Sequence, residues 1–145
     1  MILPQDFKGF LKLLNLHNVK YMLIGGYAVG YYGYPRATSD MDVWIAISSE
    51  NAKKTKEVLY DFGMVSDDVS EELFLSDNIV RMGLPPMRIE ILTKIDGVEF
   101  ERCYQNRNNV IIDDVEVPLI SLEDLKINKK ASGRHKDLND LEHLE

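Results

Sequence analysis

The apolar positions of the chain follow two different periods, and these periods divide it into helices and strands. Near the start, Phe7, Phe10, Leu11 and Leu14 have the i, i+3, i+4, i+7 spacing of an amphipathic helix, which we expect to begin behind Pro4. The short apolar run over residues 21–24 ends in a glycine pair and is typical of a buried strand. A helix-like stretch over residues 27–32 follows it.

The rest of the chain alternates in the same way between strand and helix patterns. We expect strands at residues 40–47 and 87–93, and one or two strands within residues 110–119 around Asp113–Asp114. A hairpin turn is expected at Asp77–Asn78 within residues 73–82, and helices at residues 50–62, within 95–104, at 121–132 and after Gly133. The last helix places Leu138, Leu141 and Leu144 three residues apart. Strands interspersed with helices and hairpins indicate an α/β or α+β domain with a mixed sheet.

Composition and charge narrow the class of protein further. The 145 residues suit one domain, and 45% hydrophobic with 28% charged residues is ordinary globular composition. The net charge of −7 excludes a protein that coats nucleic acid through its overall field, although a local basic site stays compatible with it. The single Cys103 cannot form an internal disulfide, and the apolar runs are far shorter than the ~20 residues that span a bilayer. We therefore expect a single domain over residues 1–145 of a cytoplasmic protein.

Two aspartates at alternate positions of one predicted strand are the most informative candidates for chemistry. Asp40 and Asp42 should emerge on the same face, about 6.5 Å apart along the backbone, while Met41 and Val43 point into the core. Two such carboxylates repel each other unless a cation screens them, and Mg²⁺ is the cation expected for oxygen ligands beside phosphates. If the strand that carries Glu90 lies alongside, three acids can hold two metal ions ~3.5–4 Å apart.

A half-solvated strand with exposed acids would show the same alternation, so the acids alone leave both interpretations open. The pair Gly25–Gly26 favours the functional one, because it follows an apolar strand and precedes a helix. Backbone N–H groups at such a turn form an anion site that a phosphate can approach without meeting a Cβ. The lysine-bearing phosphate loop and the dinucleotide fingerprint are both missing from this turn.

These segments together resemble the nucleotidyltransferase superfamily related to DNA polymerase β. The resemblance rests on an apolar-Gly-Gly turn at residues 23–26, the Asp-apolar-Asp-apolar run at residues 40–43 after 13 intervening residues, and Ile89-Glu90-Ile91. The string over residues 36–43 and the tail over residues 129–138 are similar to small bacterial and archaeal members associated with toxin–antitoxin and abortive-infection systems. The likeness spans the chain from about Tyr21 to Leu141.

The resemblance implies a fold, a reaction and a role for each residue. The fold would be a mixed sheet flanked by helices, with C-terminal helices over about residues 121–145 packed on it. Asp40 and Asp42 would hold two Mg²⁺ ions, Glu90 would ligate the catalytic one and accept the hydroxyl proton, and Gly25 and Gly26 would cradle the phosphates of an NTP. A nucleoside monophosphate would pass to a hydroxyl acceptor and pyrophosphate would leave. Many members have Ser where Gly26 stands and Asp where Glu90 stands.

Several basic and hydroxyl side chains are further candidates for phosphate binding. Arg36 and Thr38 precede the acid pair and can meet phosphate, or Arg36 can form a salt bridge within its loop. Lys129, Arg134 and Lys136 form a local basic patch that suits a triphosphate or an RNA end, and basic residues near a helix C-terminus also favour the helix dipole. The tyrosines after the glycine pair suit either base stacking or the core, and the four are Tyr27, Tyr31, Tyr32 and Tyr34.

The acceptor and the partners stay open at this stage. An RNA 3′ end, a protein side chain or a small molecule such as an aminoglycoside would each supply a hydroxyl. No acceptor-binding domain is visible, so a partner protein of a toxin–antitoxin pair or a second copy of the chain could complete the site. Two other functions compete with transfer: a non-catalytic binding module acting on a partner protein, and a metal-dependent phosphodiesterase or nuclease. NTP consumption with pyrophosphate release, as against cleavage of nucleic acid, separates the two enzymatic functions.

Overall fold

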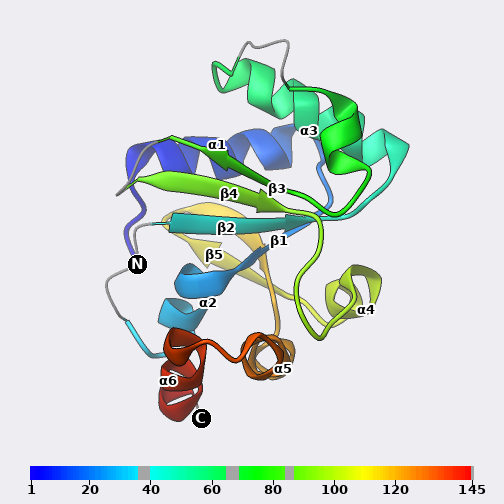
Figure 1. The fold of residues 1–145 in the computed structure, drawn as a ribbon. Helices are drawn as coiled ribbons and strands as arrows, with labels where there is room; N and C mark the ends of the chain where they lie inside the picture. Colours follow the sequence, from blue (N-terminus) through cyan, green and yellow to red (C-terminus); the bar gives the residue numbers. More distant parts are fainter. Residues whose placement is uncertain (36–39, 65–68, 84–86, 145) are drawn as a thin grey trace.

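The computed structural model describes residues 1–35, 40–64, 69–83 and 87–144, and within them helices and strands alternate along the chain (Figure 1). The helices are α1 (Gln5–Leu16), α2 (Gly25–Tyr31), α3 (Ser49–Asp61), the 3₁₀ helix η1 (Glu71–Phe74), α4 (Phe100–Gln105), α5 (Leu122–Ser132) and α6 (His135–His143). The strands are β1 (Tyr21–Ile24), β2 (Asp40–Ile45), β3 (Ile79–Met82), β4 (Arg88–Leu92), β5 (Asn108–Ile112) and β6 (Val115–Leu119).

All of these strands belong to one mixed sheet with the order β3-β4-β2-β1-β6-β5. The pairs β2–β4 and β1–β6 are parallel, and the other neighbouring pairs are antiparallel. The predicted fold class, a mixed sheet with helices around it, is therefore confirmed. The order places β2 in the middle of the sheet between β1 and β4, although residues 46–87 separate β2 from β4 in the chain.

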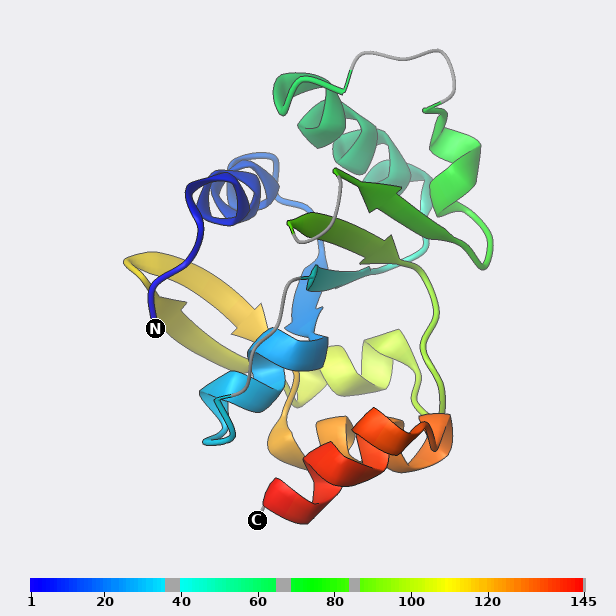
Figure 2. The ribbon, with the colours of Figure 1, turned by 60° about the vertical axis from the view of Figure 1, so that its left-hand side comes forward.

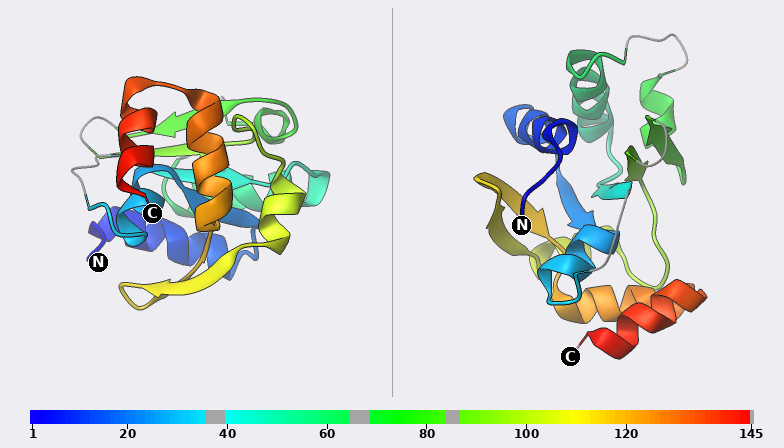
Figure 3. Two further views of the ribbon diagram at one scale, coloured as in Figure 1. Left: turned by 90° about the horizontal axis from the view of Figure 1, so that it is seen from below. Right: turned by 90° about the vertical axis from the view of Figure 1, so that its left-hand side faces the viewer.

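Helices cover both faces of the sheet (Figure 2). Helices α1 and α3 pack against each other on one side, while α2, α5 and α6 lie on the other side and α5 contacts both α2 and α6. The stripe predicted for α1 is buried, with Phe10, Leu11 and Leu14 fully covered. The two further views in Figure 3 show α5 and α6 crossing the end of the molecule where α2 begins. This end holds the candidate site.

Local side-chain chemistry sets several of the element boundaries. The Ser48 hydroxyl accepts a hydrogen bond from the backbone N–H of Asn51 and so caps α3. Asp113 and Asp114 adopt φ angles of 49° and 67°, the left-handed conformation that a two-residue hairpin turn requires, and they join β5 to β6. Gly133, at φ 65°, ends α5 and allows the chain to turn into α6.

The predicted hairpin turn at Asp77–Asn78 is wrong, because a 3₁₀ helix precedes these residues and β3 pairs with β4. Asn78 is a connecting residue: its backbone N–H donates to Thr93 Oγ1 at 2.8 Å, and its side-chain amide donates to the carbonyl of Leu73 at 3.0 Å. Phe74 is fully buried and anchors the 3₁₀ helix to the core. Asn78, which suggests a turn in the sequence, thus links η1 to the end of β4 through hydrogen bonds.

The buried side of α6 follows its predicted row of leucines only in part. Leu144, directly after the helix, is buried, but Leu138 is 46% exposed, whereas Asp137 and Asp140 are fully buried. A row of leucines at this spacing normally marks the packed side of a helix, but here two carboxylates occupy it because a lysine of α5 meets them. In the part of the chain that the structure describes, no helix has the length and apolar character needed to cross a bilayer.

Candidate active site

The three acids singled out in the sequence lie on two neighbouring strands at the edge of one cavity. In the parallel pair β2–β4, Asp42 is the register partner of Glu90, and Asp40 lies two residues earlier on β2. Met41 and Val43, which alternate with the aspartates, are fully buried on the other face. All three acids line a cavity of about 850 Å³. The structure therefore brings Asp40, Asp42 and Glu90 together, and their catalytic roles stay a prediction.

Asp42 is the acid of the three whose ionised form is least stabilised by its surroundings. Its Oδ1 atom is buried and has no hydrogen-bond partner among the described residues. Burial raises the pKa of Asp42 to about 7, the negative charges of Glu90 and Asp40 add to the effect, and Lys136 opposes it. A carboxylate in this position is costly to ionise unless a cation is added beside it.

Gly25 explains how Asp42 can sit so close to the first turn of α2. Register pairing of Ile24 with Asp42 brings the glycine directly over the carboxylate. A Cβ on Gly25 would collide with Oδ2 of Asp42 and would lie 3.0 Å from its Cγ, and the φ angle of Gly25 is +68°. The glycine is thus required for close approach to an acid, in addition to the predicted approach of a phosphate. Gly26 follows it in α2 and is buried.

Two arginines of the cavity pair with the acids, and the sequence reasoning missed both. Arg88 meets Asp40 through two contacts, Nη2 to Oδ2 at 3.1 Å and Nε to Oδ1 at 3.4 Å, and its Nη2 lies 4.0 Å from Glu90 Oε1. Arg81 donates from Nε to Glu90 Oε1 at 3.1 Å. Arg88 lies two residues before Glu90, on the same face of β4, and that spacing was a signal available in the sequence.

Lys129 lines the same cavity, but its ammonium group is engaged in a buried ion cluster. Its Nζ lies 3.2 Å from Asp137 Oδ1 and 3.1 Å from Asp140 Oδ2, and its side chain is 5% exposed. Arg134, three residues before Asp137, adds a contact of 2.8 Å from its Nε to Asp137 Oδ2. This cluster joins α5 to α6, so Lys129 organises the wall of the cavity, and a direct phosphate contact stays a prediction for it.

Arg134 and Lys136 are exposed cations on the same wall, facing the acids. The charge of Lys136 opposes the rise in the pKa of Asp42, and the pKa of Arg134 is raised chiefly by its hydrogen bond to Asp137, with a smaller contribution from the charge of Asp42. Positive groups therefore surround the acids from β3, β4 and the start of α6. Arg36 and Thr38, the other two predicted phosphate ligands, lie outside the described residues.

The tyrosines after the glycine pair are largely engaged in packing. Tyr27 is 8% exposed and meets Phe7 edge to face, the hydroxyl of Tyr32 donates to the carbonyl of Ile120, and Tyr34 stacks on His143. Tyr31 is 42% exposed. The core interpretation therefore holds for Tyr27. Tyr32 contacts the segment that leads into α5, and Tyr34 contacts α6.

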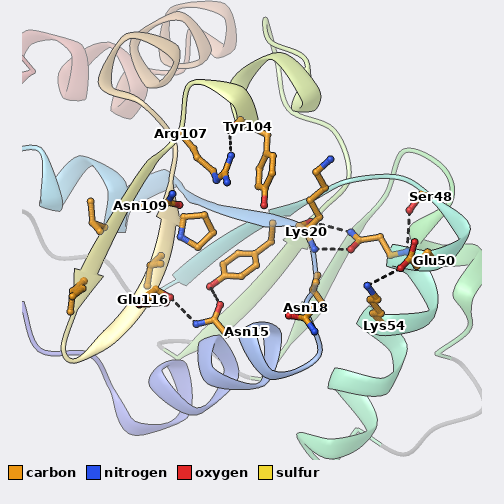
Figure 4. Close-up of a pocket in the computed structure, with 17 residues that line it drawn as sticks. Asn15, Asn18, Lys20, Ser48, Glu50, Lys54, Tyr104, Arg107, Asn109 and Glu116 are labelled. Atoms are coloured by element: carbon orange, nitrogen blue, oxygen red, sulfur yellow. Dashed lines mark hydrogen bonds and ion pairs between the residues drawn. The ribbon is translucent and has the colours of Figure 1, made fainter.

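A second cavity, of about 860 Å³, opens at the other end of β1 (Figure 4). Its polar groups are mostly bonded to one another: the hydroxyl of Tyr21 donates to Asn15, and Asn51 joins the backbone of Lys20 to that of Ala46. Since it contains no cluster of acids and no buried carboxylate without a partner, the cavity around Asp42 is the better candidate for a catalytic centre.

The donor set of the acid cavity fits Mg²⁺. Three carboxylates supply oxygen ligands only, and Oδ1 of Asp42 is a buried acceptor without a described donor. As the side chains stand, no group of three or more His, Cys, Asp or Glu among the described residues is arranged to hold a metal ion. Arg88 contacts both carboxylate oxygens of Asp40 and Arg81 contacts one of Glu90, and these are oxygens that a bound metal ion would need.

Comparison with solved structures identifies the fold. A protein of Thermotoga maritima inferred to be a nucleotidyltransferase superposes with a TM-score of 0.65 at 16% identity, over 94% of this chain and 88% of the other. The lincosamide antibiotic adenylyltransferase LnuA, in its lincomycin-bound structure, gives 0.61 at 16% identity over 99% and 96%. The antibiotic-resistance factor ANT(2'')-Ia gives 0.62 at 11% identity over 94% and 79%. The sequence matches no family model and no curated protein.

The chain therefore has the nucleotidyltransferase fold, as the resemblance in its sequence implied. At these identities the likeness is one of fold, and the reaction is argued from the cavity.

Proposed function

We propose that this protein is a metal-dependent nucleotidyltransferase that moves a nucleoside monophosphate from an NTP to a hydroxyl acceptor. The observation that carries the proposal is Asp42, whose buried Oδ1 has no hydrogen-bond partner among the described residues, flanked by Asp40 on its own strand and Glu90 on the next. Three acids in one cavity are hard to explain by stability, because each raises the cost of ionising its neighbours. Nucleotidyltransferase neighbours that include adenylyltransferases support the same reaction class.

Each group of the cavity has a part in this reaction. Asp40, Asp42 and Glu90 would hold Mg²⁺, which when bound neutralises the triphosphate and increases the acidity of the attacking hydroxyl. The backbone at Gly25 and Gly26 would approach the phosphates.

Lys136 and Arg134 line the same cavity and would bind phosphate oxygens, and Glu90 would take up the hydroxyl proton. Positioning and charge neutralisation would supply most of the acceleration, since phosphoryl transfer asks little covalent chemistry of the protein.

A small molecule is the acceptor class that we favour. The structures named above include one adenylyltransferase bound to lincomycin, and another structure of ANT(2'')-Ia contains adenylyl-2''-tobramycin. This chain spans 96% of the first of those proteins, so the two have similar lengths. An RNA 3′ end and a protein hydroxyl stay alternatives, and a partner protein of a toxin–antitoxin pair stays a prediction.

The test is a transfer assay with each α-labelled NTP, Mg²⁺ and three acceptor sets: hydroxylated small molecules, total RNA and cell lysate. We expect label transfer with pyrophosphate release, abolished in Asp42→Asn and retained in Asp77→Asn, a matched change at an exposed aspartate that pairs with Lys94 on the surface. Cleavage of nucleic acid without pyrophosphate would indicate a phosphodiesterase. If NTP is not turned over with any of the three acceptor sets, the protein would instead be a non-catalytic binding module.

A further inference from the structure

Arg88 contacts two of the three acids of the cluster, Asp40 and Glu90. It is the register partner of Asp40 on the parallel strand β4, so its side chain projects on the same face as the acids. The guanidinium meets both oxygens of Asp40, at 3.1 Å and 3.4 Å, and the side chain is 32% exposed, within the cavity. Paired N–H contacts to both carboxylate oxygens form the strong, oriented type of arginine–carboxylate pair.

The pairing of Arg88 with Asp40 opposes the metal binding proposed for Asp40. A metal ion and a guanidinium need the same carboxylate oxygens, and the positive charge of Arg88 also repels a cation that approaches Glu90, 4.0 Å away. Mg²⁺ keeps strict octahedral geometry, so it cannot simply share ligands that point elsewhere. Arg81 restrains Glu90 in the same manner, but its side chain is 54% exposed and its contact is a single one.

We propose that Arg88 is a positioning residue that holds Asp40 in the free protein and yields it to the metal when a metal–triphosphate complex enters the cavity. The inference rests on the function proposed above. The released guanidinium then has phosphate oxygens as new partners, for which its planar fork is well suited. Metal binding is therefore weak without nucleotide and strengthened by it, and by linkage the metal strengthens nucleotide binding by the same factor.

The measurement is the affinity of the full chain for Mn²⁺, as a probe for Mg²⁺, by calorimetry in the absence of nucleotide. Arg88→Gln should bind Mn²⁺ about tenfold more tightly than wild type, because the competing cation is gone. Arg88→Lys, with a single point charge instead of the fork, should fall between the two. Arg102→Gln removes the same charge from an exposed position on α4, outside the cavity, and should leave the affinity unchanged.

A second titration, in the presence of the α,β-methylene analogue of ATP, measures the coupling. The analogue should tighten Mn²⁺ binding several-fold in wild type and clearly less in Arg88→Gln, with thermal unfolding used to show that the variants are folded.

Equal or weaker Mn²⁺ binding by folded Arg88→Gln would overturn the inference. Asp42→Asn separates this failure from that of the proposed function, because unchanged Mn²⁺ binding and unchanged transfer in that variant would refute the catalytic centre itself.

Discussion

Replacing Asp42 by Asn should abolish transfer and at the same time stabilise the protein. The wild-type carboxyl is buried beside two other acids, and its pKa rises from 3.8 to about 7. Because each pKa unit corresponds to about 1.4 kcal/mol, a shift of about three units makes the ionised side chain destabilise the fold by about 4 kcal/mol. Part of the side chain is reached by water, so we expect about 2–4 kcal/mol.

The sign of the pH dependence follows from which state binds more protons. Between pH 4 and 7 the unfolded chain loses the proton of Asp42 while the folded chain keeps it, so the stability that this group contributes falls as pH rises through that range. Asn cannot ionise. The advantage of Asp42→Asn should therefore reach its full size above pH 7 and shrink to about 1 kcal/mol at pH 4.5.

Urea denaturation of both proteins at pH 4.5 and pH 8, without divalent metal, measures the two differences. Saturating Mg²⁺ should raise the stability of wild type and leave the variant unchanged, because a bound ion stabilises the folded state only where it has ligands. This prediction would be refuted if Asp42→Asn were no more stable than wild type at pH 8, or if its gain in stability were the same at both pH values. Either result would show that Asp42 is not a buried acid whose ionised form requires a cation.

Three further substitutions test the supports of the site. Gly25→Ala should lower the free energy of unfolding by more than the ~1–2 kcal/mol expected for an alanine in the left-handed conformation, and it should weaken Mn²⁺ binding, because the added Cβ would displace Asp42. Gly9→Ala is the control in both assays, since nothing lies within 4 Å of a Cβ added there. Lys129→Met should cost about 3–5 kcal/mol in urea denaturation, since two buried carboxylates lose their shared cation, and a neutral result would contradict the ion cluster. Thr93→Val should lower stability by about 1–3 kcal/mol through its lost hydrogen bonds without changing transfer, and reduced transfer in a folded variant would show that η1 affects the site.

Much of the fold followed from local pattern. The stripe of α1, the apolar strand before Gly25, and the turn at residues 113–114 each have a short-range physical cause, which periodicity and turn chemistry report directly. Asn78 shows the limit of such reasoning, because an asparagine that suggests a turn can equally donate its side-chain amide to the preceding 3₁₀ helix while its backbone N–H donates to Thr93.

The site was less accessible to sequence reasoning, since it depends on strand order. Alternation places Asp40 and Asp42 on one face, but only the parallel pairing of β2 with β4 brings Glu90 beside them, and with it Arg88. The ion cluster of Lys129 was also beyond reach. A lysine near a helix end is ordinarily exposed, and its carboxylate partners come from a separate helix whose leucines suggest a different buried side.

The pairing of β2 with β4 also determines when the site can exist. The two strands lie side by side, yet an entire helix, a 3₁₀ turn and β3 intervene between them in the chain, and closing so long a connection is entropically unfavourable until the intervening segments have themselves become ordered. In a nascent or partly refolded chain, Glu90 is thus not yet held beside Asp40 and Asp42. Recovery of metal binding during refolding would consequently report the formation of this long-range strand pair, later than any signal from the hairpin at residues 108–119.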